Sequence, residues 1–545
     1  MSGSLSIALA QINPTVGDLA GNGARILAAR ARAANADLMV TGELALSGYP
    51  PEDLVLKPAF LNAIEAEVTA LAAATQDGGP AILLGTPWRL EGNLVNAVLL
   101  IEKGRVAAAR AKHHLPNYGV FDEIRVFAPG PLPEPIPFLG LKLGVMICED
   151  MWYADVAAHL KAQGADLLLV PNGSPFETDK PHRRLDHAKA RVAETGLALV
   201  YVNQVGGQDE LVFDGASFAL GRTGDLRARL PAWDEAVETL SFQKGDLAPA
   251  SLVPEPERLD AIYRAMMVGL RDYVAKNRFP GVIIGLSGGI DSALTAAVAA
   301  DALGAQRVRC VMMPSPYTSQ DSLDDAAACA RLLGIRLDEV SIGPAMQAFE
   351  TMLKPLFAGR TPDIAEENIQ ARARGITLMA ISNKFGPMVL STGNKSEMSV
   401  GYSTLYGDMC GGYSVLKDVY KTTVFALSRW RNAHQPKGAQ GPTGPVMPER
   451  VLTKAPTAEL RPNQTDQDSL PPYDVLDAIL ERLVEGERPL AAIVAEGFDE
   501  ALVRRVWRML DRAEYKRRQA PPGVKITSRA FGRDRRYPIT NAFSG

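Results

Sequence analysis

The stretch GVIIGLSGGIDSALTAAVAA, residues 281–300, decides the fold of the second half of the chain. It opens with apolar, β-branched residues typical of a buried strand, passes through Ser287-Gly288-Gly289, and continues as an alanine-rich helix. Glycines allow a tight turn that brings backbone N–H groups close to a ligand, and the following helix adds free N–H groups and the positive end of its dipole. The stretch therefore predicts a strand, a phosphate-binding loop and a helix in direct succession.

This loop differs from the common phosphate-binding patterns, because no Lys follows the glycines and the spacing is not G-x-G-x-x-G. The hydroxyls of Ser287 and Ser292 are placed to bind phosphate oxygens, whereas the carboxylate of Asp291 would repel them unless a divalent cation lay between. We therefore expect a nucleotide together with Mg²⁺. The alternative is an ordinary strand-to-helix turn that favours glycine, and the full string S-G-G-I-D-S argues against it.

Length and composition describe a large globular protein. A chain of 545 residues is too long for one ordinary core, so two or three domains are expected. The 58 Lys and Arg against 62 Asp and Glu leave a net charge of −4, which argues against a nucleic-acid-binding or membrane-surface protein. Four cysteines without a C-x-x-C pattern fit a reducing cytoplasm, and the N-terminus resembles no export signal. We expect a cytoplasmic protein.

The first half of the chain alternates strand-like and helical segments, which predicts a layered α/β domain. The expected strands are LSIALAQI, DLMVTGE, PAILLGT, LVNAVLLI, KLGVMICED, ADLLLVPN and LALVYVNQV. The expected helices are 22–35, 60–75, 154–163 and 182–195. Proline-rich, aperiodic sequence then follows, so we predict domains over 1–245 and 259–545 with a linker over 246–258.

The second half begins with apolar residues at helical spacing: Leu259, Ile262, Met266, Leu270 and Tyr273. The runs GVIIGLSGG, VRCVMMPS and GPMVLSTGN then read as buried strands separated by helices. This order predicts a doubly wound parallel sheet with ligands beyond the carboxyl ends of its strands. The segment HQPKGAQGPTGPVMPER, 434–450, is predicted to be a mobile loop.

Three polar residues of the first domain stand at the ends of predicted strands. Cys148 ends KLGVMICED, Glu43 ends DLMVTGE, and Lys112 follows another β-run. A lone cysteine in such a place is more often a packed thiol than a nucleophile. A neighbouring base and a neighbouring cation change that reading, because a thiol needs activation and a developing oxyanion needs a fixed positive partner.

These residues lie in sequences that resemble the nitrilase-like carbon–nitrogen hydrolase family: GELALSGYPPED at 42–53, KHHLP at 112–116 and ICED at 147–150. The resemblance covers most of residues 1–245 and implies an α-β-β-α sandwich. It implies that Cys148 is the nucleophile that attacks an amide, Glu43 the general base, and Lys112 the cation that faces the oxyanion. It further places Tyr118, Ser174 and Lys180 around a glutamine substrate, for which loop residues in contact with solvent are the alternative. The six histidines follow no pattern such as H-E-x-x-H, so we predict no zinc site.

The opening string resembles the pyrophosphate loop of the ATP pyrophosphatases, and the rest of the second domain narrows the choice. Residues 366–376, 390–422 and 454–480 resemble NAD synthetase motifs. With the first domain, the whole chain resembles the glutamine-dependent NAD synthetase family. That resemblance implies glutamine hydrolysis through a thioester on Cys148 and passage of ammonia to a second site. There the carboxylate of deamido-NAD attacks the α-phosphate of ATP, and ammonia converts the acyl-adenylate to the amide.

The resemblance also assigns residues of the second domain, with Mg²⁺ as cofactor and ATP as co-substrate. For ATP they are Gly285, Leu286, Ser287, Gly288, Gly289, Ile290, Asp291, Ser292, Thr392, Lys421 and Thr457; for deamido-NAD they are Asn368, Glu397 and Lys516; for the metal they are Asp291 and Glu397. Single-domain relatives carry a Lys where this chain has Leu405, which leaves one substrate contact in doubt.

The C-terminal tail is basic. From Arg504 to Arg536, twelve Arg or Lys face three Asp or Glu. We attribute about half of these charges to a solvated helix face and the rest to anionic substrates, because the aromatics and basic domain of an RNA binder are missing. We expect small-molecule substrates, no nucleic-acid or membrane partner, and a symmetric homo-oligomer.

Two other functions were weighed: a different ATP-pyrophosphatase amidotransferase, and a non-catalytic nucleotide-binding scaffold. Position 2 is Ser, so the N-terminal cysteine of asparagine synthetase is missing, and no G-x-C-x-G elbow occurs. A scaffold would have no chemical need for Glu43, Lys112, Cys148 and Asp291 together. Both alternatives are therefore weaker.

Overall fold

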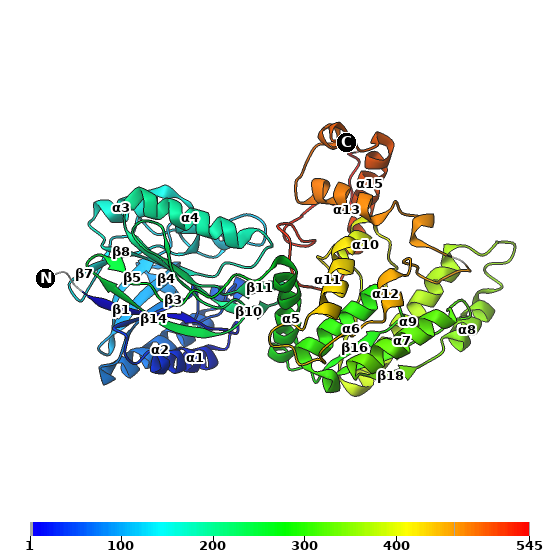
Figure 1. Ribbon diagram of the computed structural model, residues 1–545, viewed down its shortest axis with the longest axis horizontal. Helices are drawn as coiled ribbons and strands as arrows, with labels where there is room; N and C mark the ends of the chain where they lie inside the picture. Colours follow the sequence, from blue (N-terminus) through cyan, green and yellow to red (C-terminus); the bar gives the residue numbers. More distant parts are fainter. Residues whose placement is uncertain (1–3, 463, 544–545) are drawn as a thin grey trace. The chain divides into compact units, whose positions relative to one another are not determined.

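The computed structural model describes residues 4–462 and 464–543. The described chain divides into two compact units, the first ending at Glu257 and the second beginning at Arg258 (Figure 1). Among the helices of these residues, none combines the length and hydropathy needed to cross a lipid bilayer.

In the first unit, two larger β-sheets of the described residues pack face to face. One has the order β15-β14-β1-β2-β3-β4-β5 and the other β13-β12-β9-β8-β7-β6, beside a hairpin β10-β11. The strands are β1 (Leu5–Gln11), β2 (Leu38–Thr41), β3 (Ala81–Leu90), β4 (Asn93–Glu102), β5 (Arg105–Ala111), β6 (Ile136–Phe138), β7 (Leu141–Val145), β8 (Leu167–Asn172), β9 (Ala198–Asn203), β10 (Val205–Gln208), β11 (Leu211–Asp214), β12 (Phe218–Leu220), β13 (Leu226–Arg229), β14 (Ala236–Gln243) and β15 (Asp246–Leu247).

Helices cover the outer faces of this pair of sheets. They are α1 (Leu19–Arg32), α2 (Pro58–Ala74), α3 (Ala154–Ala162) and α4 (Lys180–Thr195). Figure 1 shows α1 and α2 on one side and α3 and α4 on the other. Because side chains alternate along a strand, Ile7 and Leu9 face the inner core while Ala8 and Ala10 face α1 and α2. The α-β-β-α sandwich expected from the sequence is confirmed.

The predicted linker is partly structured. It begins with β15, and its backbone pairs with the end of β13: Arg229 N donates to Ser251 O at 2.9 Å, and Val253 N donates to Arg229 O at 3.0 Å. These hydrogen bonds fix residues 246–253 to the first unit, although the composition alone indicated loose chain.

The second unit is built on a parallel sheet with the order β18-β17-β16-β19-β20. Its strands are β16 (Val282–Gly285), β17 (Val308–Met312), β18 (Arg336–Glu339), β19 (Met388–Ser391) and β20 (Tyr413–Ser414). Its helices are α5 (Arg258–Lys276), α6 (Ile290–Leu303), α7 (Gln320–Leu333), α8 (Gly343–Leu353), α9 (Ile364–Phe385), α10 (Lys395–Val400), α11 (Lys421–Ala433), α12 (Glu449–Thr453), α13 (Tyr473–Val484), α14 (Leu490–Ala495), α15 (Glu500–Arg512) and α16 (Glu514–Arg517). The doubly wound parallel sheet is confirmed, with β16 and α6 on either side of the opening loop.

The sequence predicts a mobile loop over 434–450, and the structure shows contacts from this segment to α6 and α11. Arg431 of α11 is ion-paired with Asp301 at 2.6 Å and donates to Pro442 O at 2.7 Å. Gln440 N donates to Asp301 O at 2.8 Å, and Val446 is fully buried. A buried arginine–aspartate pair therefore organises the segment, which composition alone does not reveal.

Part of the basic tail is also structural. Glu514 accepts hydrogen bonds from Arg517 at 2.8 Å and Arg535 at 3.1 Å, and Lys525 lies 3.0 Å from Asp534. All five side chains are almost fully buried. These three cations hold the C-terminal segment in place, so neither a solvated face nor a substrate is needed to explain them.

Candidate active sites

Cys148 lies in a strained turn between β7 and α3. Strand β7 ends at Val145, earlier than expected, and Cys148 begins a short 3₁₀ turn (η4, Cys148–Trp152) with φ +46°. This left-handed conformation costs about 1–2 kcal/mol for a residue with a Cβ. Asp150 closes the turn by accepting a hydrogen bond from Ile147 N at 2.9 Å. The strain therefore persists because the turn is fixed by its neighbours.

Glu43 and Lys112 meet in the same buried region. Lys112 Nζ lies 2.6 Å from Glu43 Oε1, and both side chains are fully buried. Asn96 of β4 donates to Glu43 Oε1 at 2.7 Å, and Gly173 N donates to Glu43 Oε2 at 3.0 Å. The pKa of the Cys148 thiol is raised by burial and by the Glu43 charge, while Lys112 opposes the shift. The three residues predicted to be catalytic thus converge electrostatically.

Glu123 is a second carboxylate of this site that the sequence analysis missed. It accepts hydrogen bonds from Lys112 Nζ at 2.9 Å and from Tyr49 OH at 2.9 Å. Burial raises the pKa of Glu123 to about 7, with Lys112 lowering it and Glu43 raising it. One ammonium thus faces two carboxylates. Glu123 ends the string PNYGVFDE, residues 116–123, so an acid after two aromatic residues was the available signal.

The predicted glutamine-binding residues have different surroundings. Tyr118 OH donates to Glu149 at 3.0 Å, next to Cys148 in the chain. Lys180 Nζ lies 3.5 Å from Glu177 and 5.3 Å from the centre of the Phe121 ring. Ser174 is buried, and its Oγ accepts a hydrogen bond from Arg184 at 3.1 Å, which ties it to the internal framework.

The phosphate loop of the second unit opens on a cavity of about 290 Å³. Every residue predicted to contact ATP lines it, and so does Glu397. Asn368 and Lys516 lie outside this lining. Asn368 Oδ1 accepts from Thr404 Oγ1 at 2.9 Å, and Lys516 Nζ donates to Gly401 O and Ser403 O, both at 2.7 Å.

Glycine is required in this loop at one position. Gly288 has φ +82°, and a Cβ there would lie 2.3 Å from the backbone oxygen of Ser322 on α7. Ser292 Oγ accepts from Ser287 N at 3.2 Å and donates to Gly289 O at 3.0 Å, so the loop is braced from within. Helix α6 begins at Ile290, and its N-terminal N–H groups lie at the cavity, near the carboxyl end of β16.

The predicted metal ligands converge on Lys421. Its Nζ lies 2.5 Å from Asp291 Oδ2 and 3.0 Å from Glu397 Oε1. Burial raises the pKa of Glu397 to about 7, with Lys421 lowering it and Asp291 raising it. Asp466 lines the same cavity, and its charge, like those of Asp291 and Glu397, raises the pKa of Lys421 against the effect of burial. Oxygen donors with excess negative charge are what Mg²⁺ requires, so these residues fit the ion.

Comparison with known proteins decides the family. The carbon-nitrogen hydrolase model matches residues 6–250, and the NAD synthase model matches residues 262–520. The chain is 54% identical over 547 residues to the glutamine-dependent NAD(+) synthetase of Rhodobacter capsulatus, covering 99% of each. The chain belongs to the glutamine-dependent NAD(+) synthetase family.

Solved structures agree with this membership in the glutamine-dependent NAD(+) synthetase family. The synthetase of Acinetobacter baumannii, solved in complex with adenosine diphosphate, covers 100% of both chains with a TM-score of 0.79 and 44% identity. The enzyme of Cytophaga hutchinsonii has a TM-score of 0.83 at 23% identity and covers 99% of this chain and 98% of its own, which shows a shared fold.

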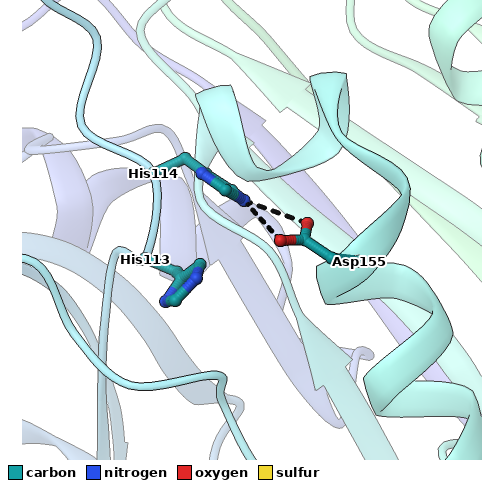
Figure 2. Close-up of side chains that lie close together, drawn as sticks. All are labelled: His113, His114 and Asp155. Atoms are coloured by element: carbon teal, nitrogen blue, oxygen red, sulfur yellow. Dashed lines mark hydrogen bonds and ion pairs between the residues drawn. The ribbon is translucent and has the colours of Figure 1, made fainter.

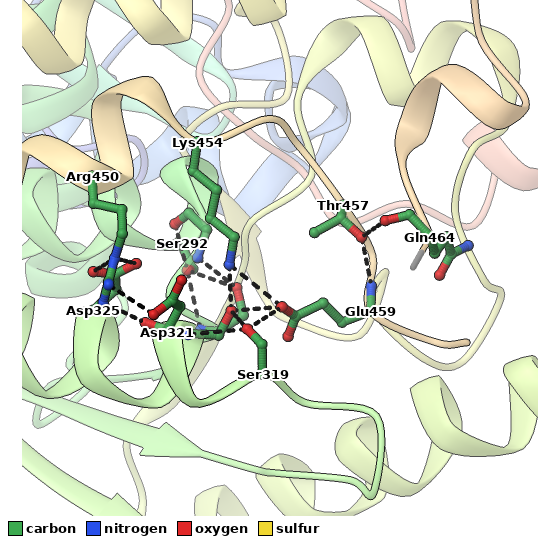
Figure 3. Close-up of polar contacts among 12 residues, drawn as sticks. Ser292, Ser319, Asp321, Asp325, Arg450, Lys454, Thr457, Glu459 and Gln464 are labelled. Atoms are coloured by element: carbon green, nitrogen blue, oxygen red, sulfur yellow. Dashed lines mark hydrogen bonds and ion pairs between the residues drawn. The ribbon is translucent and has the colours of Figure 1, made fainter. Parts of the chain in front are cut away.

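Lys454 and Glu459 are polar residues of the cavity wall that the sequence analysis did not single out. Figure 3 shows that both side chains reach residues at the start of α7, next to Ser319. Lys454 Nζ lies 2.6 Å from Ser322 Oγ, and Glu459 Oε1 accepts from Ser322 Oγ at 2.7 Å. Thr457, between them, donates to Gln464 O. Lys454 is the first residue of the 454–480 motif, so its place in that motif was the available signal.

Leu405 stands where single-domain relatives were expected to carry Lys. Its side chain packs against the hydrophobic cluster of α13 and α15, which includes Leu476 and Val506. The substitution is therefore explained locally by packing.

Proposed function

We propose that this chain catalyses the glutamine-hydrolysing, ATP-dependent amidation of deamido-NAD to NAD, the final step of NAD biosynthesis. The observation that carries the proposal is the presence of both sites in one chain: Cys148, Glu43 and Lys112 together in the first unit, and a braced phosphate loop facing carboxylates in the second.

In the first site, Glu43 takes the proton of the Cys148 thiol, and the sulfur attacks the carboxamide carbon of glutamine. Lys112 faces the oxyanion, and Glu123 holds the ammonium in place. Glu43 returns the proton to the departing ammonia, which leaves a thioester; water activated by Glu43 then releases glutamate and restores the thiol. Tyr118, Ser174 and Lys180 are proposed to bind the glutamine.

In the second site, the loop from Gly285 to Ser292 binds the pyrophosphate portion of ATP through its N–H groups and hydroxyls. Mg²⁺ held by Asp291 and Glu397 would neutralise the departing pyrophosphate. Thr392, Lys421 and Thr457 are proposed to bind ATP, and Asn368, Glu397 and Lys516 to bind deamido-NAD.

The carboxylate of deamido-NAD attacks the α-phosphate and expels pyrophosphate, because a carboxylate is a poor acyl donor until it is adenylated. Ammonia from the first site then attacks the acyl-adenylate and expels AMP. We propose that the ammonia is channelled to this site. The family resemblance and the described cysteines, all of which are free thiols, support a cytoplasmic enzyme with small-molecule substrates, which we propose is a homo-oligomer without a nucleic-acid partner.

The proposal is tested by incubating the purified chain with deamido-NAD, ATP, Mg²⁺ and glutamine labelled with ¹⁵N at its amide. We expect labelled NAD together with equal amounts of AMP, pyrophosphate and glutamate. Formation of ADP and phosphate would contradict adenylation. Glutamine hydrolysis with no NAD under any ionic condition would instead favour an amidotransferase with a different acceptor.

A further inference from the structure

A cluster of histidine and aspartate lies near the nucleophile turn, outside the proposed catalytic groups. One ring nitrogen of His113, one of His114 and one carboxylate oxygen of Asp155 lie within 4.8 Å of one another (Figure 2). Among residues 4–462 and 464–543, this is the only group of three such side chains that lie this close together. The sequence analysis did not pair them, because Asp155 is distant along the chain and is brought close by the fold.

His114 and Asp155 are already in contact. His114 Nε2 lies 2.9 Å from both oxygens of Asp155, and the His114 ring stacks on Tyr153 with centres 4.2 Å apart. The Asp155 side chain is 49% exposed. Stacking thus orients the histidine, and the half-exposed carboxylate is held by His114 and by Val156 N, which donates to its Oδ1 at 2.8 Å.

His113 has a defined tautomer. Its Nδ1 lies 2.8 Å from Gly130 O, and a carbonyl oxygen only accepts, so Nδ1 carries the proton. In the neutral imidazole, Nε2 therefore keeps its lone pair. A histidine that donates one ring N–H to a backbone carbonyl while the other nitrogen stays basic is the usual arrangement of a metal-binding imidazole.

We propose that His113, His114 and Asp155 form a binding site for a divalent transition-metal ion of the Zn²⁺ type. Two imidazoles and a carboxylate suit Zn²⁺, Co²⁺ or Ni²⁺ rather than Mg²⁺, and water would complete a four-coordinate shell. Ligand atoms about 2.1 Å from the ion lie roughly 3.4 Å apart in a tetrahedron, so the longest separations in the cluster must shorten by up to about 1.4 Å, while the His114–Asp155 contact lengthens. This proposal differs from the sequence-based expectation of no zinc site.

The site adjoins the first active site through Asp150. Asp150 Oδ1 accepts from His113 N at 3.1 Å and from His114 N at 2.8 Å, while its Oδ2 accepts from Ile147 N at 2.9 Å. One buried carboxylate thus joins the backbone of the two histidines to the residue before Cys148. A metal ion at this site would crosslink that backbone to the N-terminus of α3.

Binding is measured by titrating chelator-treated protein with Co²⁺ and then Zn²⁺, in excess Mg²⁺ so that oxygen-only sites are filled. Visible Co²⁺ absorption reports the geometry, and competition with a chromophoric chelator gives Zn²⁺ stoichiometry and affinity. We expect wild type to bind one equivalent of Zn²⁺. The variants H113N, H114Q and D155N should each lower the affinity for Zn²⁺ by more than about tenfold. Asn and Gln retain the donors at Nδ1 of His113 and Nε2 of His114, so these changes remove the ligands and keep the hydrogen bonds, although H114Q loses the ring contact with Tyr153.

His182→Gln is the matched control, because His182 also faces a carboxylate, Glu255 at 3.8 Å, but belongs to no such group of three within the described residues. We expect it to bind Zn²⁺ as wild type does. Zn²⁺ should also raise the unfolding temperature of wild type and not that of D155N, whose exposed side chain makes misfolding no obstacle. Equal Zn²⁺ affinity in wild type and D155N would overturn the proposal, leaving an ordinary His–Asp surface pair.

Discussion

At the scale of the residue, Glu123 shows how a buried charge sets the local chemistry. Lys112 is shared between Glu123 and Glu43, both buried, so the site carries more carboxylate than ammonium. Burial disfavours the charged form of Glu123 and raises its pKa to about 7, so Glu123 gains a proton easily. A neutral Glu123 donates one hydrogen bond and leaves the full charge of Lys112 to Glu43 and the substrate.

Replacement of Glu123 by Gln tests this through stability. The folded-state pKa of about 7 lies above the ordinary value of 4.5, so between these values the folded state holds a proton that the unfolded state has lost. Stability from this group is present below about pH 4.5 and is lost as pH rises to about 7. Thermal unfolding should show wild type losing stability relative to E123Q across that range. A constant difference between the two proteins would contradict it.

Residue identities were only partly predictable. Cys148, Glu43 and Lys112 were singled out because each stands near the end of a strand-like run and lies in a motif that resembles the carbon–nitrogen hydrolases. Glu123 lies in a short turn with no such signal, and Asp155 lies in the first turn of an exposed helix. Their roles depend on contacts between distant segments, which local patterns do not encode.

At the scale of the element, the junction between β16 and α6 depends on the backbone of Gly288. Its φ of +82° and the 2.3 Å approach of Ser322 O leave no room for a Cβ. We expect Gly288→Ala to cost about 1–3 kcal/mol in backbone strain in addition to this clash. Calorimetry should show ATP binding weakened by roughly ten- to a hundredfold.

Gly289→Ala is the control for this prediction. Gly289 has φ −89°, and the nearest atom to its Cβ is Ser287 Oγ at 3.3 Å, the end of a side chain that turns easily. Binding of ATP should change much less. If both variants bind ATP alike, the loop is not held against α7 as described.

The helices and strands, like the site residues, were only partly predictable from the sequence. Long apolar runs such as β8 and the regular spacing of α5 were predicted, because their periodicity is local. The strands β18 and β20 were missed: β18 is largely polar, and β20 has only two residues. The contacts that anchor the segment 434–450 were not predicted, because the Arg431–Asp301 pair joins distant parts of the chain.

At the scale of the whole molecule, each unit has its own hydrophobic core and its own candidate site. We expect Cys148→Ala to lower glutamine-dependent NAD synthesis by at least about a thousandfold, since the nucleophile is lost. Synthesis from free ammonium should persist, because only the nitrogen source is removed. Steady-state assays with each nitrogen source measure both. Equal loss with both sources would contradict the division of labour.

Asp291→Asn is expected to give the complementary result. Synthesis should fall by about a hundredfold or more with either nitrogen source, because a ligand for the metal and a partner of Lys421 is weakened. The variant should still hydrolyse glutamine, as measured by glutamate release. Near-normal turnover would exclude Asp291 from metal binding.

The ammonium of Lys421 has a consequence for the order of loading. It neutralises Asp291 and Glu397 from between them, as a tethered counter-ion would. A cation that displaces it leaves the ammonium of Lys421, whose side chain is 2% exposed, without its partners, and that buried charge needs an anion. Displacement of the Lys421 ammonium by Mg²⁺ and binding of ATP are therefore coupled. Mg²⁺ alone should bind Asp291 and Glu397 weakly, whereas the Mg²⁺–ATP complex should bind tightly.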